Sequence, residues 1–307
     1  MKNVTLVLSC YNEEKCVKKM YDNAINQLSD NFSYEFLFVN DGSIDNTKNE
    51  LLDLKQNNQK QNVNITIIDL SKNFGHEAAM LAGLDNANGD YVVFMDSDGQ
   101  HPISAVNEAL SKLENGSDIV SMVRTENKDQ TFIGSFFSST FYKMINKLSG
   151  TSFIENASDF FAVDKKVIDY LKCNYRERIR FMRGIVQNIG FERTKVFYKA
   201  DSRISGKTHY NYKKLTSFAI TTMLCYTNTP LHLGVAVGMF SGFLGVVLLI
   251  YTFITRKTAP SGYATIIIFL CFMFAILFML VGIIGEYLAI IFAEIKNRPN
   301  YIIKQIL

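Results

Sequence analysis

Two uncharged apolar segments, residues 231–254 and 264–285, constrain the fold of this chain more than any other feature. At about 1.5 Å per residue in a helix, they would be about 36 and 33 Å long. The hydrocarbon core of a bilayer is roughly 30 Å thick, so each segment is long enough to cross it. Two buried core helices are the alternative, but charge-free runs of this length favour two membrane-spanning helices.

The basic residues around these segments predict how they are oriented. They gather before the first segment and after the second, at Lys207, Lys213, Lys214, Lys296, Arg298 and Lys304. The connecting loop carries only Arg256 and Lys257. Because orientation follows the Lys/Arg excess, we expect a cell-membrane protein with both termini in the cytoplasm and a short external hairpin. The first residues lack the pattern of a signal peptide, so residues 1–228 are also expected to stay in the cytoplasm.

The composition disfavours two other classes of protein. A formal net charge of +3 is too small to indicate a nucleic-acid partner. The cysteines are scattered and form no C-x-x-C pair: Cys10, Cys16, Cys173, Cys225 and Cys271. They are therefore expected to be small apolar residues in a reducing compartment, and neither a disulfide framework nor a redox motif is predicted.

Up to about residue 228 the chain has the alternating pattern of an α/β protein. Apolar strand candidates cover residues 4–9, 34–39, 64–70, 91–95, 118–122, 158–162 and 192–198. Helical stretches separate most of them, and strands that alternate with helices predict a doubly wound, mainly parallel sheet. No G-x-G-x-x-G motif follows the first strand, which disfavours a dinucleotide-binding dehydrogenase.

Acidic residues follow two of these strands directly. The run from Tyr91 to Met95 ends in Asp96 and Asp98, and Gly99 then breaks the chain. Asp41 follows the second strand in a similar way. Ligands of open α/β sheets bind at the carboxyl ends of strands, and paired carboxylates can hold a divalent cation. The sequence therefore predicts a metal-nucleotide site at this edge of the sheet.

Basic residues after the fifth strand are candidates for binding an anionic group. Four arginines occur between residues 176 and 183, and residues 203–210 form a basic, glycine-containing loop. They could bind a substrate phosphate, or they could be a solvated face or a patch for lipid headgroups. Residues 212–226 then have the pattern of an amphipathic helix on the membrane surface. His76 and His101 have no partner histidines at ligand spacing, so a zinc site is not expected.

Several short motifs occur in a specific order along the chain. The first four are Ser9-Cys-Tyr-Asn-Glu-Glu14, Asn40-Asp-Gly-Ser43, Asn73-Phe-Gly75 and Asp96-Ser-Asp-Gly-Gln100. This set resembles the signature of family 2 glycosyltransferases with the GT-A fold. The later motifs are Ser158-Asp-Phe160, Arg180-Phe-Met-Arg-Gly184, Ser205-Gly-Lys-Thr208, Gly285-Glu-Tyr287 and Lys296-Asn-Arg-Pro299. They are similar to those of the polyprenyl-phosphate glycosyltransferases, which are related to dolichyl-phosphate mannose synthase and include bacterial undecaprenyl-phosphate glucosyltransferases.

This resemblance covers nearly the whole chain and implies an architecture and a reaction. The architecture is an α/β, Rossmann-like GT-A domain at residues 1–205, an amphipathic juxtamembrane region at 206–229, a two-helix transmembrane hairpin at 230–290 and a cytoplasmic tail at 291–307. The implied reaction is metal-dependent and inverting. It moves a sugar from UDP-glucose or UDP-N-acetylglucosamine to undecaprenyl phosphate, which gives a lipid-linked monosaccharide for modifying a cell-surface polymer. Mg²⁺ or Mn²⁺ is the implied cofactor, and a homotetramer is the implied assembly.

The site residues that the resemblance implies fall into three groups. The nucleotide sugar would be bound by Tyr11, Glu13, Asp41, Asp96 and Gln100. Asp98 would be the metal ligand, and the catalytic set would be Asp96, Asp98 and Asp159. The acceptor phosphate is already anionic and needs cationic clamps more than a strong base; these would be Arg124, Arg183, Arg203 and Lys207.

The chain also departs from the usual pattern of these enzymes. Gly99 and His101 stand where a leucine and a second aspartate are usual, and Phe161 stands where an arginine commonly follows Asp-Phe. A catalytically inactive membrane scaffold with the same fold is therefore one alternative. A processive polysaccharide synthase is the other, but such enzymes use a Gln-x-x-Arg-Trp motif and this chain has no tryptophan.

Overall fold

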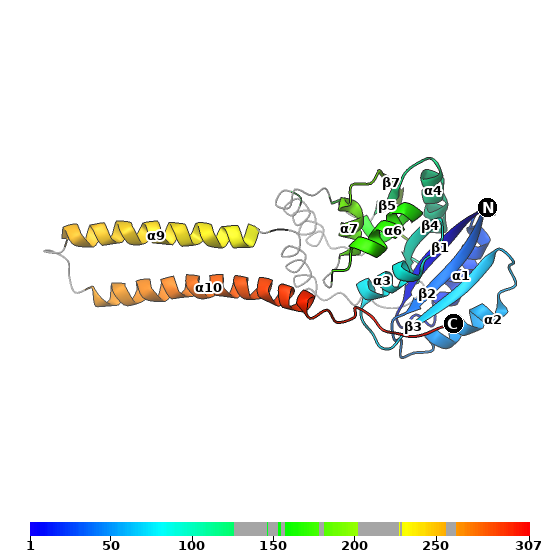
Figure 1. Cartoon of the computed structure of the whole chain (residues 1–307), viewed down its shortest axis with the longest axis horizontal. Helices are drawn as coiled ribbons and strands as arrows, with labels where there is room; N and C mark the ends of the chain where they lie inside the picture. The colour runs from blue at the N-terminus through cyan, green and yellow to red at the C-terminus, as the bar shows by residue number, and fades with distance from the viewer. Residues whose placement is uncertain are drawn as a thin grey trace. The chain divides into compact units, whose positions relative to one another are not determined.

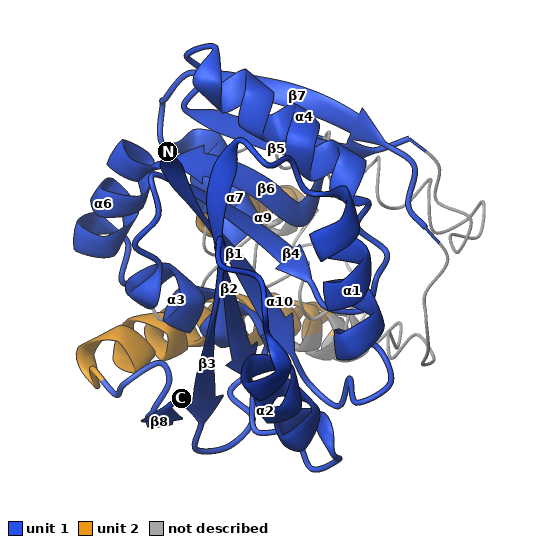
Figure 2. Ribbon diagram, turned by 90° about the vertical axis from the view of Figure 1, so that its right-hand side faces the viewer, with its two compact units in different colours: residues 1–146, 151–211, 298–307 blue, residues 147–150, 212–297 orange. Residues whose placement is uncertain are grey.

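The computed structural model describes residues 1–125, 146, 153–154, 157–177, 181–201, 227, 229–255 and 262–307. The chain divides into two compact units, coloured separately in Figure 2. The first comprises residues 1–146, 151–211 and 298–307, and the second comprises residues 147–150 and 212–297. The predicted amphipathic helix at 212–226 lies outside the described residues.

The first unit contains one eight-stranded sheet with the strand order β7-β5-β6-β4-β1-β2-β3-β8. The strands are β1 (Lys2–Cys10), β2 (Phe32–Asn40), β3 (Val63–Leu70), β4 (Tyr91–Asp96), β5 (Ile119–Arg124), β6 (Ala157–Asp164), β7 (Arg193–Tyr198) and β8 (Ile303–Ile306). β1 pairs in parallel with both β2 and β4, and β2–β3 and β5–β7 are also parallel. β6 is antiparallel to β4 and β5, and β8 is antiparallel to β3. The predicted α/β class with a mainly parallel sheet is confirmed.

The central strands are buried on both faces, which explains their nearly continuous apolar sequences. Along β1, Leu6 and Leu8 belong to one hydrophobic cluster and Val7 belongs to another. The first cluster also contains residues of α1 (Val17–Gln27), α2 (Thr47–Asn57) and α4 (Ile103–Glu114). The second contains residues of α3 (His76–Asn86), α6 (Lys165–Asn174) and α7 (Met182–Asn188). Helices therefore cover both faces of the sheet, as Figures 1 and 2 show.

The last ten residues return to this sheet instead of forming a separate tail. β8 pairs with the free edge of β3, and the Gln305 side chain donates a hydrogen bond to Asp69 at 3.0 Å. The Tyr301 hydroxyl donates to Asp85, and Arg176 contacts the same carboxylate at 2.7 Å. From the sequence, residues 291–307 are expected only as a cytoplasmic tail, because a four-residue strand has too little periodicity to be recognised alone.

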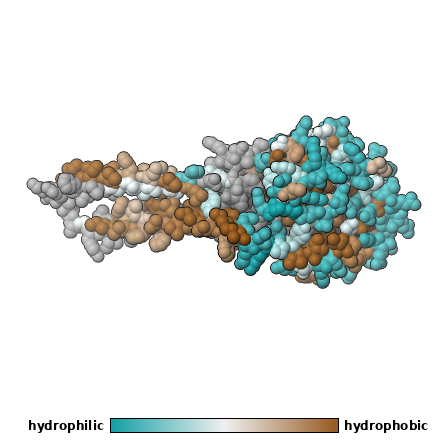
Figure 3. Space-filling view, in the orientation of Figure 1, coloured by the Kyte–Doolittle hydropathy of each residue, from teal (hydrophilic) through white to brown (hydrophobic). Residues whose placement is uncertain are grey.

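The second unit contains two long helices, α9 (Thr229–Thr255) and α10 (Tyr263–Ile295). Many of their large apolar side chains are exposed, including Phe243, Phe278 and Phe292. Figure 3 shows this surface as a largely hydrophobic colour along both helices. Thr229–Val247 and Phe272–Ile295 are long and apolar enough to cross a membrane, by length and composition, with mean hydropathies of 1.7 and 2.4. The two helices are thus candidate membrane spans, and α10 extends well beyond the predicted end at residue 285.

Candidate active site

A cavity of about 250 Å³ opens at the carboxyl ends of β1, β2 and β4. The side chains that line it include Tyr11, Glu13, Asp41, His76, Asp96 and Asp98. β1 lies between β4 and β2, and the chain leaves β1 toward β2 but leaves β4 in the opposite direction, toward β5. Such a switch point is where open α/β sheets bind ligands. Five residues that were predicted to bind the donor or the metal therefore line one cavity.

The turn after β4 presents Asp98 to this cavity. Gly99 has a positive φ of 81°, a backbone conformation that glycine adopts without strain. Asp98 accepts a hydrogen bond from the backbone N–H of Gln100 at 3.0 Å, which fixes the carboxylate inside its own turn. The Ser97 hydroxyl donates to the carbonyl of Ser9 at 2.8 Å and ties the turn to β1. The unusual glycine at position 99 is thus explained by the backbone.

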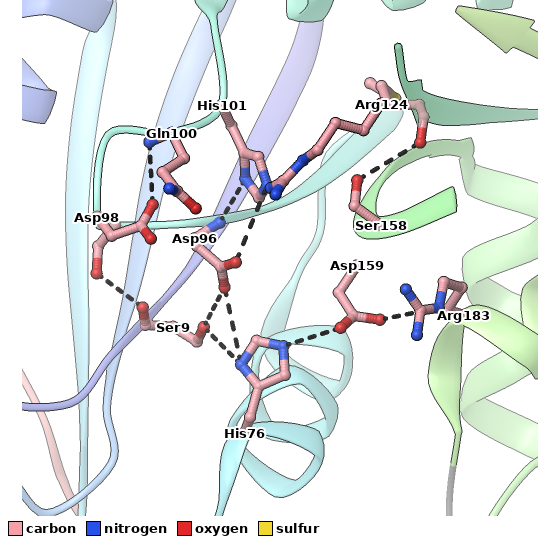
Figure 4. A network of polar contacts seen from close by, with 12 residues as sticks. Ser9, His76, Asp96, Asp98, Gln100, His101, Arg124, Ser158, Asp159 and Arg183 are labelled. Carbon is pink, nitrogen blue, oxygen red and sulfur yellow. Dashed lines mark hydrogen bonds and ion pairs between the residues drawn. The ribbon is translucent and has the colours of Figure 1, made fainter. Parts of the chain in front are cut away.

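Asp96 lies among donors and cations, as Figure 4 shows. The Ser9 hydroxyl donates to its Oδ1 at 3.3 Å, and His76 Nδ1 lies 3.8 Å from the same oxygen. His101 Nε2 lies 3.9 Å from Oδ2. Burial raises the pKa of Asp96, but the two histidines, Ser9 and Arg124 outweigh that effect and hold the pKa below its ordinary value. Asp96 is therefore ionised at neutral pH.

His101 is buried among aromatic side chains of the domain core. Its ring is buried, stacks on Phe160 with a centroid separation of 4.4 Å, and meets Tyr198 edge-on. Burial lowers its pKa, against the opposing effects of Asp96 and Asp98, so the imidazole is neutral. Because Nδ1 accepts the backbone N–H of Asp96 at 3.0 Å, the single ring proton resides on Nε2. This residue, where an aspartate is usual, therefore supports the position of Asp96.

Asp41 holds the loop that leads into α3. Its two carboxylate oxygens accept the backbone N–H groups of Phe74 at 2.7 Å and Gly75 at 2.9 Å. Gly75 has a φ of 96° and directly precedes the first helical residue, His76. Burial raises the pKa of Asp41, and the two hydrogen bonds only partly oppose that rise. Asp41 thus fixes the position from which His76 enters the cavity.

A second group of charged residues comes from β5, β6 and α7. Asp159 Oδ1 lies 3.6 Å from Arg183 Nε, and Asp159 Oδ2 lies 3.7 Å from His76 Nε2. Arg124, the last residue of β5, donates from Nε to the Tyr198 hydroxyl at 3.5 Å. Its charge also contributes to the lowered pKa of Asp96. The structure therefore brings three more of the predicted site residues (Arg124, Asp159 and Arg183) close to the cavity.

The structure does not assign Arg203, Lys207 or Phe161 to the cavity. Arg203 and Lys207 lie outside the described residues, so their roles stay predictions. Phe161 is buried and stacks on Phe94 at 4.6 Å, so it serves the core of the domain. Ser9 and His76 line the cavity but were not predicted from the sequence as site residues. Their positions could have indicated them. Ser9 begins the first motif, at the end of β1, and His76 directly follows the Asn73-Phe-Gly75 motif, at the start of α3.

The described acidic side chains do not by themselves complete a metal site. No group of three or more His, Cys, Asp or Glu side chains among the described residues could enclose a metal ion. Carboxylate oxygens are nevertheless the ligands that Mg²⁺ and Mn²⁺ prefer. Mg²⁺ is commonly bound through one or two carboxylates together with substrate phosphates. Asp98 fits a cation of this kind that shares its ligands with a nucleotide diphosphate.

Comparison with known proteins identifies the family to which this chain belongs. The family model described as glycosyl transferase family 2 matches residues 5–171, more than half of the chain, so the chain belongs to glycosyl transferase family 2. The prediction of a GT-A glycosyltransferase is confirmed, and the chain is an enzyme of the transferase class.

Relatives of nearly equal length narrow this class. An uncharacterised glycosyltransferase from Synechocystis sp. is 32% identical, over 99% of this chain and 95% of the relative. The SfII prophage-derived bactoprenol glucosyl transferase of Shigella flexneri is 30% identical, over 98% of this chain and 97% of the relative. The prophage bactoprenol glucosyl transferase homolog of Escherichia coli is 30% identical, over 99% of both chains. The similarity thus includes the part of the chain that contains α9 and α10.

Proposed function

We propose that this enzyme transfers a glucosyl group from a nucleotide sugar to a polyprenyl phosphate of the bactoprenol type. The observation that carries the proposal is the nearly full-length similarity to bactoprenol glucosyl transferases, which extends over both apolar helices. UDP-glucose is the first donor to test, and UDP-N-acetylglucosamine is the second. The product is a lipid-linked monosaccharide that can supply sugar for a cell-surface polymer.

The donor occupies the cavity at the carboxyl ends of β1, β2 and β4. Tyr11, Glu13 and Asp41 bind the nucleoside. Each carboxylate oxygen of Asp41 already accepts one backbone N–H and has a second lone pair for a ligand donor. Asp96 accepts hydroxyl groups of the ribose or the sugar. Asp98 would hold the metal ion, and Gln100 would contact the metal or the diphosphate. The shared cavity supports the assignments of Tyr11, Glu13, Asp41, Asp96 and Asp98. Gln100 is supported by its backbone hydrogen bond to Asp98.

The reaction is a single displacement at the anomeric carbon. An oxygen of the acceptor phosphate forms the new bond to that carbon while the bond to the nucleotide diphosphate breaks, and the electron pair leaves with the diphosphate. The configuration is therefore inverted. A bound Mg²⁺ or Mn²⁺ supplies positive charge that stabilises the departing diphosphate. Since a phosphate monoester is already ionised near neutral pH, this chain does not need a strong general base.

The acceptor phosphate is bound by cations on the side of β5, β6 and α7. Arg124 and Arg183 are the described candidates, with Arg203 and Lys207 as predicted additions. A guanidinium can contact two phosphate oxygens at once, which fixes the orientation of the nucleophile as well as its charge. Asp159 lies within ion-pair distance of Arg183 and orients it. The apolar helices keep the enzyme in the membrane plane that contains the polyprenyl chain.

The topology proposed with this function places the catalytic unit and both termini in the cytoplasm. A single cysteine at Ser261, in a background without native cysteines, should react with a membrane-impermeant reagent in intact cells. Protection of that position until the cells are permeabilised would contradict an external hairpin. Assembly as a homotetramer also stays a prediction.

The function is tested with membranes or purified full-length enzyme, undecaprenyl phosphate and labelled nucleotide sugars. We expect an organic-extractable product that releases its sugar in mild acid, with UDP-glucose as the best donor. The Asp98→Asn variant, prepared in parallel, is the negative control. A water-soluble polymer would instead favour a processive synthase. Lack of product with every common UDP- and GDP-sugar would overturn the proposal and favour an inactive scaffold.

A further inference from the structure

His76 lies between the two sets of charged residues that the proposed reaction uses. It is the first residue of α3 and lines the cavity, with 40% of its side chain exposed. Its Nδ1 lies 3.1 Å from the Ser9 hydroxyl and 3.8 Å from Asp96 Oδ1. On the opposite side of the ring, Nε2 lies 3.7 Å from Asp159 Oδ2. One imidazole thus faces both Asp96, on the proposed side of the nucleotide sugar, and Asp159, on the proposed side of the acceptor (Figure 4).

The hydrogen bonds and charges around His76 favour the imidazolium form. The Ser9 hydroxyl has one proton, and when it donates that proton to Asp96 it can only accept from His76 Nδ1. When Nε2 also carries a proton, the ring is positively charged and its N–H faces the negative carboxylate of Asp159, which is favourable. Burial lowers the pKa of His76, but Asp96, Asp159 and the neighbouring Glu77 outweigh burial and the opposing charge of Arg183, so the pKa is raised. Histidine suits this position because its cation has N–H donors on two opposite sides of one rigid ring.

Asp159 supplies an independent observation. Its Oδ1 is buried and makes no hydrogen bond among the described residues. Its contacts with His76 and Arg183, at 3.7 and 3.6 Å, are ion pairs longer than hydrogen bonds. A buried carboxylate oxygen without a hydrogen bond is expected to accept one when a ligand binds. The position of Asp159 therefore depends on the cations beside it, and His76 is the one that also contacts the donor side.

We propose that His76 is a positioning residue for glycosyl transfer, which holds Asp96 and Asp159 on its two sides so that an anionic acceptor can approach the sugar between them. This inference rests on the proposed function. The cavity already contains Asp41, Asp96 and Asp98, and the donor and acceptor phosphates add further negative charge. A cation at the centre reduces the repulsion among these groups and fixes their geometry. His101, by contrast, is buried against Phe160 and supports only the Asp96 side.

The test uses the full-length enzyme with the variants His76→Ala and His76→Gln. We expect kcat to fall by about tenfold to a hundredfold in both, the size of loss that a misplaced reacting group causes. We expect the KM for the nucleotide sugar to change by less than about threefold, because the nucleoside contacts are unaltered. Added imidazole should restore part of the activity of His76→Ala, since the side chain it replaces is open to the cavity. His76→Gln, which fills that space, should not respond.

The controls separate this inference from the proposed function. Wild-type enzyme and Asp98→Asn are measured with and without imidazole, and neither should gain activity. The thermal unfolding midpoint of each His76 variant shows whether it is folded. If wild type makes no product, the proposed function fails. If wild type is active and the folded His76 variants match it, or if His76→Ala is impaired and imidazole restores nothing, the positioning role is wrong and the function stands.

Discussion

The substitution Asp41→Asn tests the contact that joins the end of β2 to the loop before α3. Asp41 is 3% exposed, and its two oxygens accept the backbone N–H groups of Phe74 and Gly75 at 2.7 and 2.9 Å. An asparagine has nearly the same shape but only one acceptor oxygen. Its amide group must therefore face one of the two N–H donors, so one hydrogen bond is lost and one buried donor is left without a partner.

The expected magnitude follows from three contributions. Losing a hydrogen bond to a charged group costs about 1.5–3 kcal/mol, and the remaining bond becomes weaker because its acceptor is neutral. The opposing contribution is burial, which raises the pKa of Asp41 and shows that burying this carboxylate is itself unfavourable. A neutral asparagine avoids that cost, which offsets part of the loss. The net destabilisation is about 2 kcal/mol, which for a domain of this size corresponds to a fall of about 4–8 °C in the unfolding midpoint.

The assay is thermal unfolding of the full-length protein in detergent, together with titration by UDP. We expect the midpoint to fall and the affinity for UDP to weaken, because Asp41 both fixes the loop and lines the cavity. Asp53→Asn, at an exposed position on α2, removes the same charge as a matched control and should change neither quantity. An Asp41→Asn protein with the midpoint and the UDP affinity of wild type would refute the reasoning.

Three further predictions concern other parts of the first unit. Asp98→Asn should lower transfer at least about a hundredfold while the protein still inserts into membranes, and near-normal activity would contradict a metal-binding role. Gln305→Ala removes one hydrogen bond to Asp69 and should lower the free energy of unfolding by about 1 kcal/mol, whereas the exposed neighbour Lys304→Ala should not. Burial and Asp159 raise the pKa of Glu77 from 4.5 to about 7, so the stability linked to its protonated form is fully present below pH 4.5 and is lost as the pH rises through about 7. Unfolding midpoints measured across this range should therefore fall more in wild type than in Glu77→Gln, and parallel curves would contradict the raised pKa.

Much of the fold could be predicted from the sequence because the signals are local. The strand from Tyr91 to Asp96 is apolar until its last residue, since both faces of the central sheet are covered by helices. A carboxylate directly after such a strand must emerge at the edge of the sheet, so Asp41, Asp96 and Asp98 could be assigned to one site without coordinates. The apolar spans were equally evident, because their length and lack of charge need no tertiary information.

Other parts of the site depend on contacts between distant segments. His76 and Asp159 are far apart in the chain, and nothing near either residue indicates that they face each other. His101 was recognised only as a departure from the family pattern, and its stacking on Phe160 gave the reason. The short strand β8 is recognisable only through its pairing with β3.

The sequence by itself determined the class of the fold, the candidate membrane spans and the carboxylates that line the cavity. These depend on hydrophobic periodicity and on residues that directly follow a strand, and both are properties of neighbouring positions. Only the tertiary structure decided the strand order, the return of the C-terminus to the sheet and the central position of His76. These depend on which side chains from distant segments meet, and that is fixed by the packing of the whole domain.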